Sequence, residues 1–274
     1  MTRPPAPARP RPPGAGPLLF RPTSSPLQTR PRLASLSDTF SMTVDAEITL
    51  VLFDIDGTLL DVHGAGRQAF VNCLATVFDW KDSLDYIRFD GSTDLDILRK
   101  VLARHGVVPN RTDEEKFFRQ LPLELDQTLQ RSQTTLHPGV RDVLEILGKY
   151  PHVLTGLVTG NIESCARLKL EKFGLHGHFL LGAFGHEHAD RGQIAGLAMV
   201  RARQQIQAGQ QIKHRFLIGD TPSDIMAASA IGARSIAVAT GRHNRESLED
   251  AGADHVLDSL ADVDTVLSLL RVKT

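Results

Sequence analysis

The chain has 274 residues, of which 41% are hydrophobic and 23% charged, and this apolar content excludes disorder over its whole length. Its 31 basic residues nearly balance its 32 acidic ones, so the net charge of -1 gives no electrostatic case for binding nucleic acid or an acidic membrane surface. The two cysteines, Cys73 and Cys165, have neither zinc nor redox spacing, and no segment approaches the roughly 20 apolar residues of a membrane span. We therefore expect a cytoplasmic monomer or homodimer with no nucleic-acid or membrane partner.

The first residues differ in composition from the rest. Residues 1–41 contain ten of the 15 prolines and six arginines, and Asp38 is their only acid. Proline at this density removes backbone hydrogen-bond donors, and few large apolar side chains are present to offset the entropy lost on ordering. We expect residues 1–46 to form a disordered tail rich in proline and arginine. The alternatives are a targeting peptide, although the prolines would interrupt its amphipathic helix, and a translation start at Met42.

From Thr49 onward, short apolar segments alternate with helical patterns. The segments typical of buried parallel strands lie at residues 49–53, 154–158, 216–218 and 235–238. Helical patterns follow at residues 162–173, 192–207 and 222–231. This alternation predicts an α/β fold with a doubly wound, Rossmann-like parallel sheet, in which ligands bind beyond the carboxyl ends of the strands.

One long segment interrupts the alternation. About a hundred residues separate the first two predicted strands, and they show helical patterns near residues 66–77, 94–105, 112–129 and 139–147 but no convincing buried strand. We predict a helical cap over residues 63–136, inserted into an α/β core of residues 47–62 and 137–274. A cap placed directly after the first strand would overhang the carboxyl edge of the sheet, where it can close over a ligand and exclude water.

Carboxylates follow two of the predicted strands. Asp54 and Asp56 come directly after the first strand, and Asp220 and Asp224 follow the strand at residues 216–218. Like charges in a poorly solvated cleft repel strongly, so four carboxylates at one sheet edge favour a divalent cation between them, and an all-oxygen set suits Mg²⁺. Helix capping is the alternative for Asp220 and Asp224, but it does not explain why both acidic pairs follow buried strands.

The order of these motifs resembles the haloacid dehalogenase superfamily of phosphotransferases. Apolar strands lead in turn to Asp54-x-Asp56-Gly57-Thr58, to Thr159 and to Gly219-Asp220-x-x-x-Asp224, with a basic residue at a helix start before the last of them. The resemblance covers residues 48 to about 270, and the predicted insertion matches the family's small α-helical cap. Within the superfamily, residues 91–94 (GSTD) and 232–241 resemble the phosphoglycolate phosphatase-like branch.

The resemblance implies hydrolysis of a phosphate ester through an aspartyl phosphate. Asp54 would be the nucleophile that attacks phosphorus, and Asp56 would be the general acid and base. Members that cleave carbon–halogen or phosphonate bonds lack an acid at the position of Asp56, so phosphate esters are the expected substrates. Thr159 and the backbone amide of Gly160 would bind the phosphoryl oxygens.

The resemblance also implies a Mg²⁺ ion and a basic side chain at the site. The ion would be held by Asp54, Asp220, the backbone carbonyl of Asp56 and, directly or through water, Asp224. The family usually provides a lysine at the start of a later helix, but no lysine lies between Lys172 and Lys213, and Arg191 occupies that position. An arginine there can neutralise both phosphoryl group and nucleophile, although it is not freely interchangeable with lysine. The alternative is a solvated charge at a helix start.

The cap should contribute the contacts that choose the substrate. Arg67 and Thr93 are the candidate substrate-facing residues of the cap, together with Arg88 and Asp90. A surface ion pair is the alternative for Arg67, and a helix cap is the alternative for Thr93. The expected substrate is a small phosphorylated metabolite, with phosphoglycolate, a sugar phosphate, pyrophosphate or a nucleotide all open, because specificity depends on pocket shape.

Three functions are compatible with this sequence. The first is a Mg²⁺-dependent phosphatase acting on a small phosphomonoester. A sugar-phosphate mutase of the same branch would use the same aspartyl phosphate but return the phosphoryl group to its substrate. A non-catalytic binding protein of the same fold is the third, and the intact set of aspartates argues against it.

Overall fold

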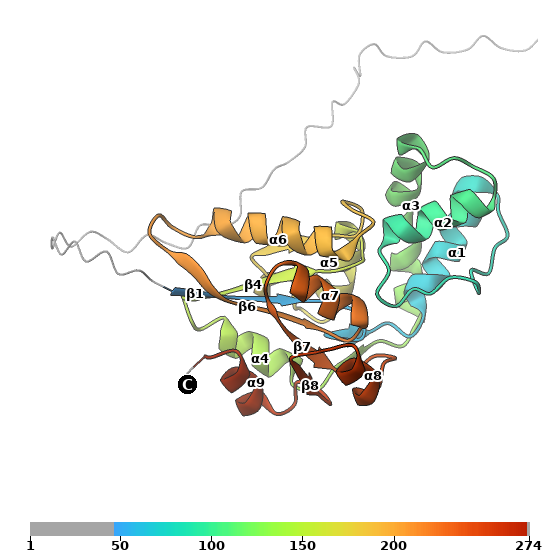
Figure 1. Cartoon of the computed structure of the whole chain (residues 1–274). Helices are drawn as coiled ribbons and strands as arrows, with labels where there is room; N and C mark the ends of the chain where they lie inside the picture. Colours follow the sequence, from blue (N-terminus) through green and yellow to red (C-terminus); the bar gives the residue numbers. More distant parts are fainter. Residues whose placement is uncertain (1–46, 273–274) are drawn as a thin grey trace, which may run out of the picture. The chain divides into compact units, whose positions relative to one another are not determined.

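The computed structural model describes residues 47–272, so the predicted tail of residues 1–46 lies outside the described residues. Its centre is a six-stranded sheet in the order β5-β4-β1-β6-β7-β8, with every neighbouring pair parallel (Figure 1). The strands are β1 (Glu47–Phe53), β4 (Val153–Val158), β5 (Leu181–Ala183), β6 (Gln211–Gly219), β7 (Arg234–Val238) and β8 (His255–Leu257). The predicted α/β fold is confirmed.

Alternate side chains of β1 pack into two separate apolar clusters, because successive residues of a strand point to opposite faces of the sheet. Val51 and Phe53 belong to one apolar cluster, and Leu50 and Leu52 belong to the other. All four are fully buried, which explains why the strand reads as a continuous apolar run rather than an alternating one. The sheet is therefore covered on both faces.

The helices of the core form two layers. Side chains of α6 (Arg191–Gln205) and α7 (Pro222–Ala230) pack on one face, while those of α4 (Val140–Leu147), α5 (Glu163–Glu171) and α9 (Val263–Leu269) belong to the cluster of the other face. Figure 1 shows α6 opposite α4 and α9 across the sheet. The remaining core elements are α8 (Arg245–Asp250) and a short 3₁₀ helix, His176–His178. Within residues 47–272, no helix combines the length and apolar composition needed to cross a membrane.

The inserted segment forms the helices α1 (Ala65–Phe78), α2 (Asp94–Arg104) and α3 (Arg111–Arg131), close to the predicted positions. The chain enters and leaves it through β2 (Leu60–Asp61) and β3 (Thr135–Leu136), which pair antiparallel. The sequence showed no convincing strand here, because each of these strands is only two residues long. The boundaries of cap and core stay a prediction, and this pair lies beside both of them.

The strand order fixes where a ligand can bind. After β1 the chain adds β4 and β5 on one side of it and β6, β7 and β8 on the other, so the order reverses between β1 and β6. Phe53 of β1 pairs with Ile218 of β6, and the amide of Asp54 donates to the carbonyl of Ile218 at 2.9 Å. Both strands end at this crevice, which is where open α/β sheets bind ligands.

Candidate active site

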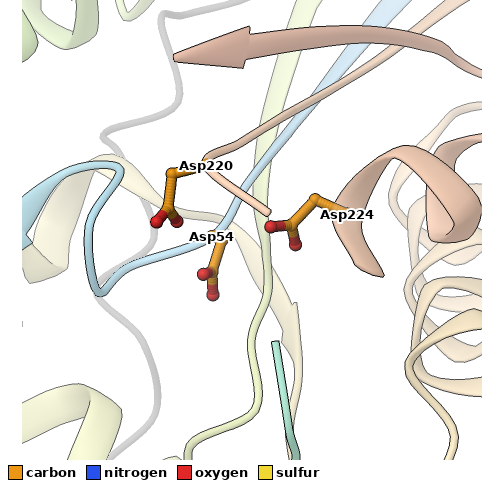
Figure 2. Close-up of side chains that lie close together, drawn as sticks. All are labelled: Asp54, Asp220 and Asp224. Atoms are coloured by element: carbon orange, nitrogen blue, oxygen red, sulfur yellow. The ribbon is translucent and has the colours of Figure 1, made fainter. Parts of the chain in front are cut away.

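Three carboxylates meet at this crevice. Asp54 follows β1, Asp220 follows β6 and Asp224 lies in the first turn of α7. One oxygen from each lies within 4.8 Å of the others, and all three side chains are buried. Figure 2 shows them converging from three separate elements. The structure thus brings together three of the four aspartates that the sequence pointed to.

The positive charge of nearby side chains only partly offsets the negative charge of these buried carboxylates. Burial raises the pKa of Asp54 to about 6, with Arg191 opposing this rise and Asp224 adding to it. Burial and the charges of Asp224 and Asp54 raise the pKa of Asp220 well above its usual value. Among the described residues, Asp54 Oδ1 is buried without a hydrogen-bond partner. A hard divalent cation with oxygen ligands fits this donor set.

Two glycines and the hydroxyl of Thr58 surround the carboxylate of Asp220. Gly57 has a φ of 81°, and a Cβ at this position would overlap the Asp220 carboxylate, as would one at Gly241. Thr58 Oγ1 donates to Asp220 Oδ1 at 3.1 Å. Gly57 is therefore required both by its backbone conformation and by the close approach of a ligand-type carboxylate.

The two carboxylate oxygens of Asp224 have different partners. Its Oδ2 accepts from the Thr221 amide at 3.1 Å and from Thr221 Oγ1 at 2.6 Å, which forms a capping box at the start of α7. Its Oδ1 accepts from Arg191. The capping alternative is therefore correct for Asp224, although this side chain also faces the cluster; for Asp220 it is wrong, because Thr221 is the N-cap.

Arg191 is the cation of this cluster. It is the first residue of α6, after the N-cap Asp190, and only 8% of it is exposed. Its Nη1 lies 3.3 Å from Asp54 Oδ2 and also bonds to Asp224. Burial lowers the pKa of Arg191, but the charges of Asp224 and Asp54 outweigh this and raise it. The solvated alternative for Arg191 does not hold.

The carboxylate of Asp56 belongs to a second network. It accepts from Lys169 Nζ at 2.7 and 2.6 Å and from Asn161 Nδ2 at 2.7 Å. Lys169 also donates to Asn161 Oδ1 at 2.7 Å, and Asn161 Nδ2 reaches Thr159 Oγ1 at 2.9 Å. Lys169 is 4% exposed; burial lowers its pKa, but the charge of Asp56, its hydrogen bond to Asp56 and the charge of Asp94 together raise the pKa above its usual value. The network joins Asp56 to Thr159.

Sequence reasoning did not single out Asn161 or Lys169. Lys169 falls on the buried face of α5 with Cys165, Ala166 and Leu170, at helical spacing. A lysine on an otherwise apolar helix face needs a buried partner, and this signal was available in the sequence. Asn161 lies two residues beyond Thr159 in the loop after β4, where sequence alone does not separate it from an ordinary loop residue.

Of the four cap candidates, Arg67 and Asp90 line the cavity described below, whereas Arg88 and Thr93 do not. The guanidinium of Arg67 donates to the carbonyls of Leu84 at 2.6 Å and Ile87 at 3.0 Å and lies over the Phe89 ring. Thr93 is the N-cap of α2, which is the helix-cap alternative expected from the sequence. Its hydroxyl accepts a hydrogen bond from the Asp96 amide at 3.2 Å.

The start of α2 docks onto the loops that carry the core candidates. The Asp94 amide donates to the carbonyl of Gly160 at 2.8 Å, and Asp94 Oδ2 accepts from the Ile162 amide at 2.8 Å. The hydroxyl of Thr93 donates to the carbonyl of Ala189 at 3.1 Å. Burial raises the pKa of Asp94 to about 7, against the opposing effects of the Ile162 amide and Lys169.

A cavity of about 330 Å³ connects the cap with the sheet edge. The candidate residues of the core that line it are Asp54, Asp56, Thr159, Gly160, Arg191 and Asp220. Its other end is lined by side chains of the three cap helices. The aspartates, the threonine and the arginine can therefore all reach one ligand.

Comparison with known proteins gives consistent results. The sequence profile of the haloacid dehalogenase-like hydrolase family matches residues 51–238. The phosphoglycolate phosphatase of Vibrio vulnificus (strain YJ016) is 29% identical over 227 residues, which cover 81% of this chain and 97% of that protein. The phosphoglycolate phosphatase of Aliivibrio fischeri is 27% identical over 230 residues, covering 82% of this chain and 99% of its own.

A solved structure shows the same fold. CbbY from Rhodobacter sphaeroides, in complex with phosphate, superposes with a TM-score of 0.60 at 22% identity, over 79% of this chain and 96% of that one. The family profile spans most of the described core and cap, and the relatives align over nearly their whole length. The chain therefore belongs to the haloacid dehalogenase-like hydrolase family, in which it resembles the phosphoglycolate phosphatases.

Proposed function

We propose that the chain, a phosphatase of this family, hydrolyses a small phosphomonoester with the help of Mg²⁺ through an aspartyl phosphate on Asp54. The observation that carries the proposal is the cluster of Asp54, Asp220, Asp224 and Arg191 at the end of the cavity. One oxygen of the buried Asp54 carboxylate has no hydrogen-bond partner among residues 47–272, and the guanidinium of Arg191 lies beside this carboxylate to offset phosphoryl charge.

The reaction takes two displacements at phosphorus. An oxygen of Asp54 attacks the phosphorus, the bond to the leaving oxygen breaks, and Asp56 gives its proton to that oxygen. Asp56 then removes a proton from a water molecule, whose oxygen attacks the phosphorus of the aspartyl phosphate. The bond to Asp54 breaks, so phosphate is released and the carboxylate is restored.

Other groups bind and orient the phosphoryl group. Asp54, Asp220 and the backbone carbonyl of Asp56 would hold Mg²⁺, which supplies positive charge against the repulsion between nucleophile and phosphate. Both oxygens of Asp224 are already bonded to the protein, so Asp224 would act through Arg191 or through water. Thr159 and the amide of Gly160 would bind phosphoryl oxygens.

Phosphate release tests this function directly. With p-nitrophenyl phosphate and a panel of phosphorylated metabolites, free phosphate should appear with Mg²⁺ and stop in EDTA. Asp54→Asn should remove turnover while circular dichroism stays unchanged, and Asp56→Asn should lower the rate by about 10² or more. Undiminished turnover in EDTA or in Asp54→Asn would overturn the mechanism. Conversion of a sugar phosphate into its isomer without free phosphate would identify a mutase instead.

The metal site can be tested apart from activity. Gly57→Ala should push the Asp220 carboxylate aside and weaken Mg²⁺ binding by about tenfold or more, measured by calorimetric titration. Gly106→Ala is the matched control, because Gly106 also has a positive φ, of 72°, but an added Cβ meets nothing within 4 Å. Equal Mg²⁺ affinity in both variants would contradict the placement of the ion beside Asp220.

Arg191 should act through its charge and its two-pronged geometry. Arg191→Ala is expected to lower kcat by about 10³, and Arg191→Lys should restore part of this loss because it keeps only the charge. Arg201→Ala provides the control: Arg201 lies on the same helix and pairs with Glu187 at 2.8 Å, outside the cavity. Wild-type rates for a folded Arg191→Ala would remove Arg191 from the mechanism.

Lys169 should act as a positioning residue for Asp56. Lys169→Met is expected to lower kcat for an alkyl phosphate by about 10², since its leaving oxygen needs the proton of Asp56. In the first displacement, measured as the rate of the p-nitrophenol burst, the loss should be much smaller for p-nitrophenyl phosphate, whose leaving group needs no proton, and Lys169→Arg should recover part of the rate for the alkyl phosphate. Lys172→Met is the control, because Lys172 bonds only to the Leu129 carbonyl among the described residues. Equal losses for both substrates would indicate a purely structural role.

A further inference from the structure

We propose that the cap end of the cavity accepts an uncharged and largely apolar leaving group, so that the preferred substrates are phosphate esters of apolar alcohols rather than of a carboxylated alcohol such as glycolate. This inference rests on the proposed function, since it concerns the group that departs from phosphorus. It differs from what the names of the relatives would suggest.

The two ends of the cavity differ in chemistry. The sheet end carries the aspartates, Thr159 and Arg191. The cap end is lined by the apolar side chains of Phe70 from α1, Phe89, Ile97 from α2, and Leu121 and Leu125 from α3. With about 330 Å³ in total, the cavity holds a phosphoryl group together with a leaving group of several carbon atoms.

The cations that line the sheet end are occupied. Lys169 donates to both oxygens of Asp56, and Arg191 is bonded between Asp54 and Asp224. On the proposed mechanism Arg191 serves the phosphoryl group, so it has no further charge to offer to the leaving group. A substrate carboxylate would have to separate Lys169 from Asp56, which the reaction needs in place.

The cations nearer the cap are no better placed. The guanidinium of Arg67 is bonded to two backbone carbonyls and stacked on Phe89, so it builds the wall of the cavity rather than facing its interior as a free donor. Arg242 lies 3.3 Å from Asp90 and its side chain is 74% exposed. No other lysine or arginine among residues 47–272 lines the cavity.

Acidic side chains outnumber basic ones along the cavity, six to four. The aspartates that line the cavity are Asp54, Asp56, Asp61, Asp90, Asp94 and Asp220. The N-terminus of α1, at Gly64 and Gly66, is another place that can attract an anion, but Asp61, which precedes the N-cap Gly64 in sequence, also lines the cavity and opposes an anion there. A carboxylate at the cap end would lose its hydration without gaining a cation.

A matched pair of substrates tests whether the cap end prefers an uncharged leaving group. We expect kcat/KM for the phosphate ester of glycolamide to exceed that for 2-phosphoglycolate at least tenfold, because the two differ mainly in charge. Along the series from ethyl to butyl phosphate, each added methylene should raise kcat/KM about fourfold, the factor that corresponds to burying one methylene, about 0.8 kcal/mol.

A pair of variants tests whether the leaving group binds at the cap end of the cavity. Leu125→Phe should narrow the cap end and lower kcat/KM for butyl phosphate at least tenfold while changing ethyl phosphate less than about twofold. Leu123→Phe is the control on the same helix, because Leu123 is 57% exposed. If Leu125→Phe fails to fold, as its melting curve would show, the substrate series on the unmodified chain still decides the matter.

The outcomes separate this inference from the proposed function. Failure of every ester, including p-nitrophenyl phosphate, would overturn both. Mg²⁺-dependent phosphate release with a kcat/KM for 2-phosphoglycolate equal to or above that of the amide would overturn this inference alone and assign the carboxylate to the start of α1. A rate that does not rise along the alkyl series would also overturn it.

Discussion

Burial of three carboxylates at one sheet edge is the constraint on which the rest of the site depends. The parallel pairing of β1 with β6 forces Asp54 and Asp220 together, and the first turn of α7 adds Asp224. Charges this close are tolerated only when donors and cations surround them. The hydroxyl of Thr58 and the guanidinium of Arg191 provide part of this compensation, and the raised pKa values of Asp54 and Asp220 show that it is incomplete. The uncompensated negative charge destabilises the fold, and it also makes this edge of the sheet a favourable site for a cation.

The structure gives the two aspartates of the first motif different partners. Asp54 faces Asp220 and Arg191, whereas the carboxylate of Asp56 turns to Lys169 and Asn161. Each carboxylate thus has its own cation, which limits the repulsion between them. Because Asn161 also contacts Thr159, the group proposed to move the proton and the group proposed to bind phosphate share one hydrogen-bond network.

Sequence reasoning located those residues whose position in the fold follows from the order of elements along the chain. Strand β1 and the aspartates after it are local features, and Arg191 was identified by its place at a helix start in an ordered set of motifs. Prediction failed for β5 and β8, which have three residues each and depend on pairing with a neighbouring strand. It also missed α8 and α9, which are too short to show a clear helical period. The partnership of Lys169 with Asp56 joins residues 113 positions apart and becomes visible only in the folded chain.

The contacts at the start of α2 couple the cap to the chemistry. Thr93 and Asp94 bond to the backbone of Ala189, Gly160 and Ile162, on the loops that carry Arg191 and Thr159. Moving α2 away would therefore break hydrogen bonds to the loops that carry Thr159 and Arg191. A ligand that contacts both the cap and these loops would therefore favour the arrangement in which they are docked, by its difference in affinity for that arrangement over any other.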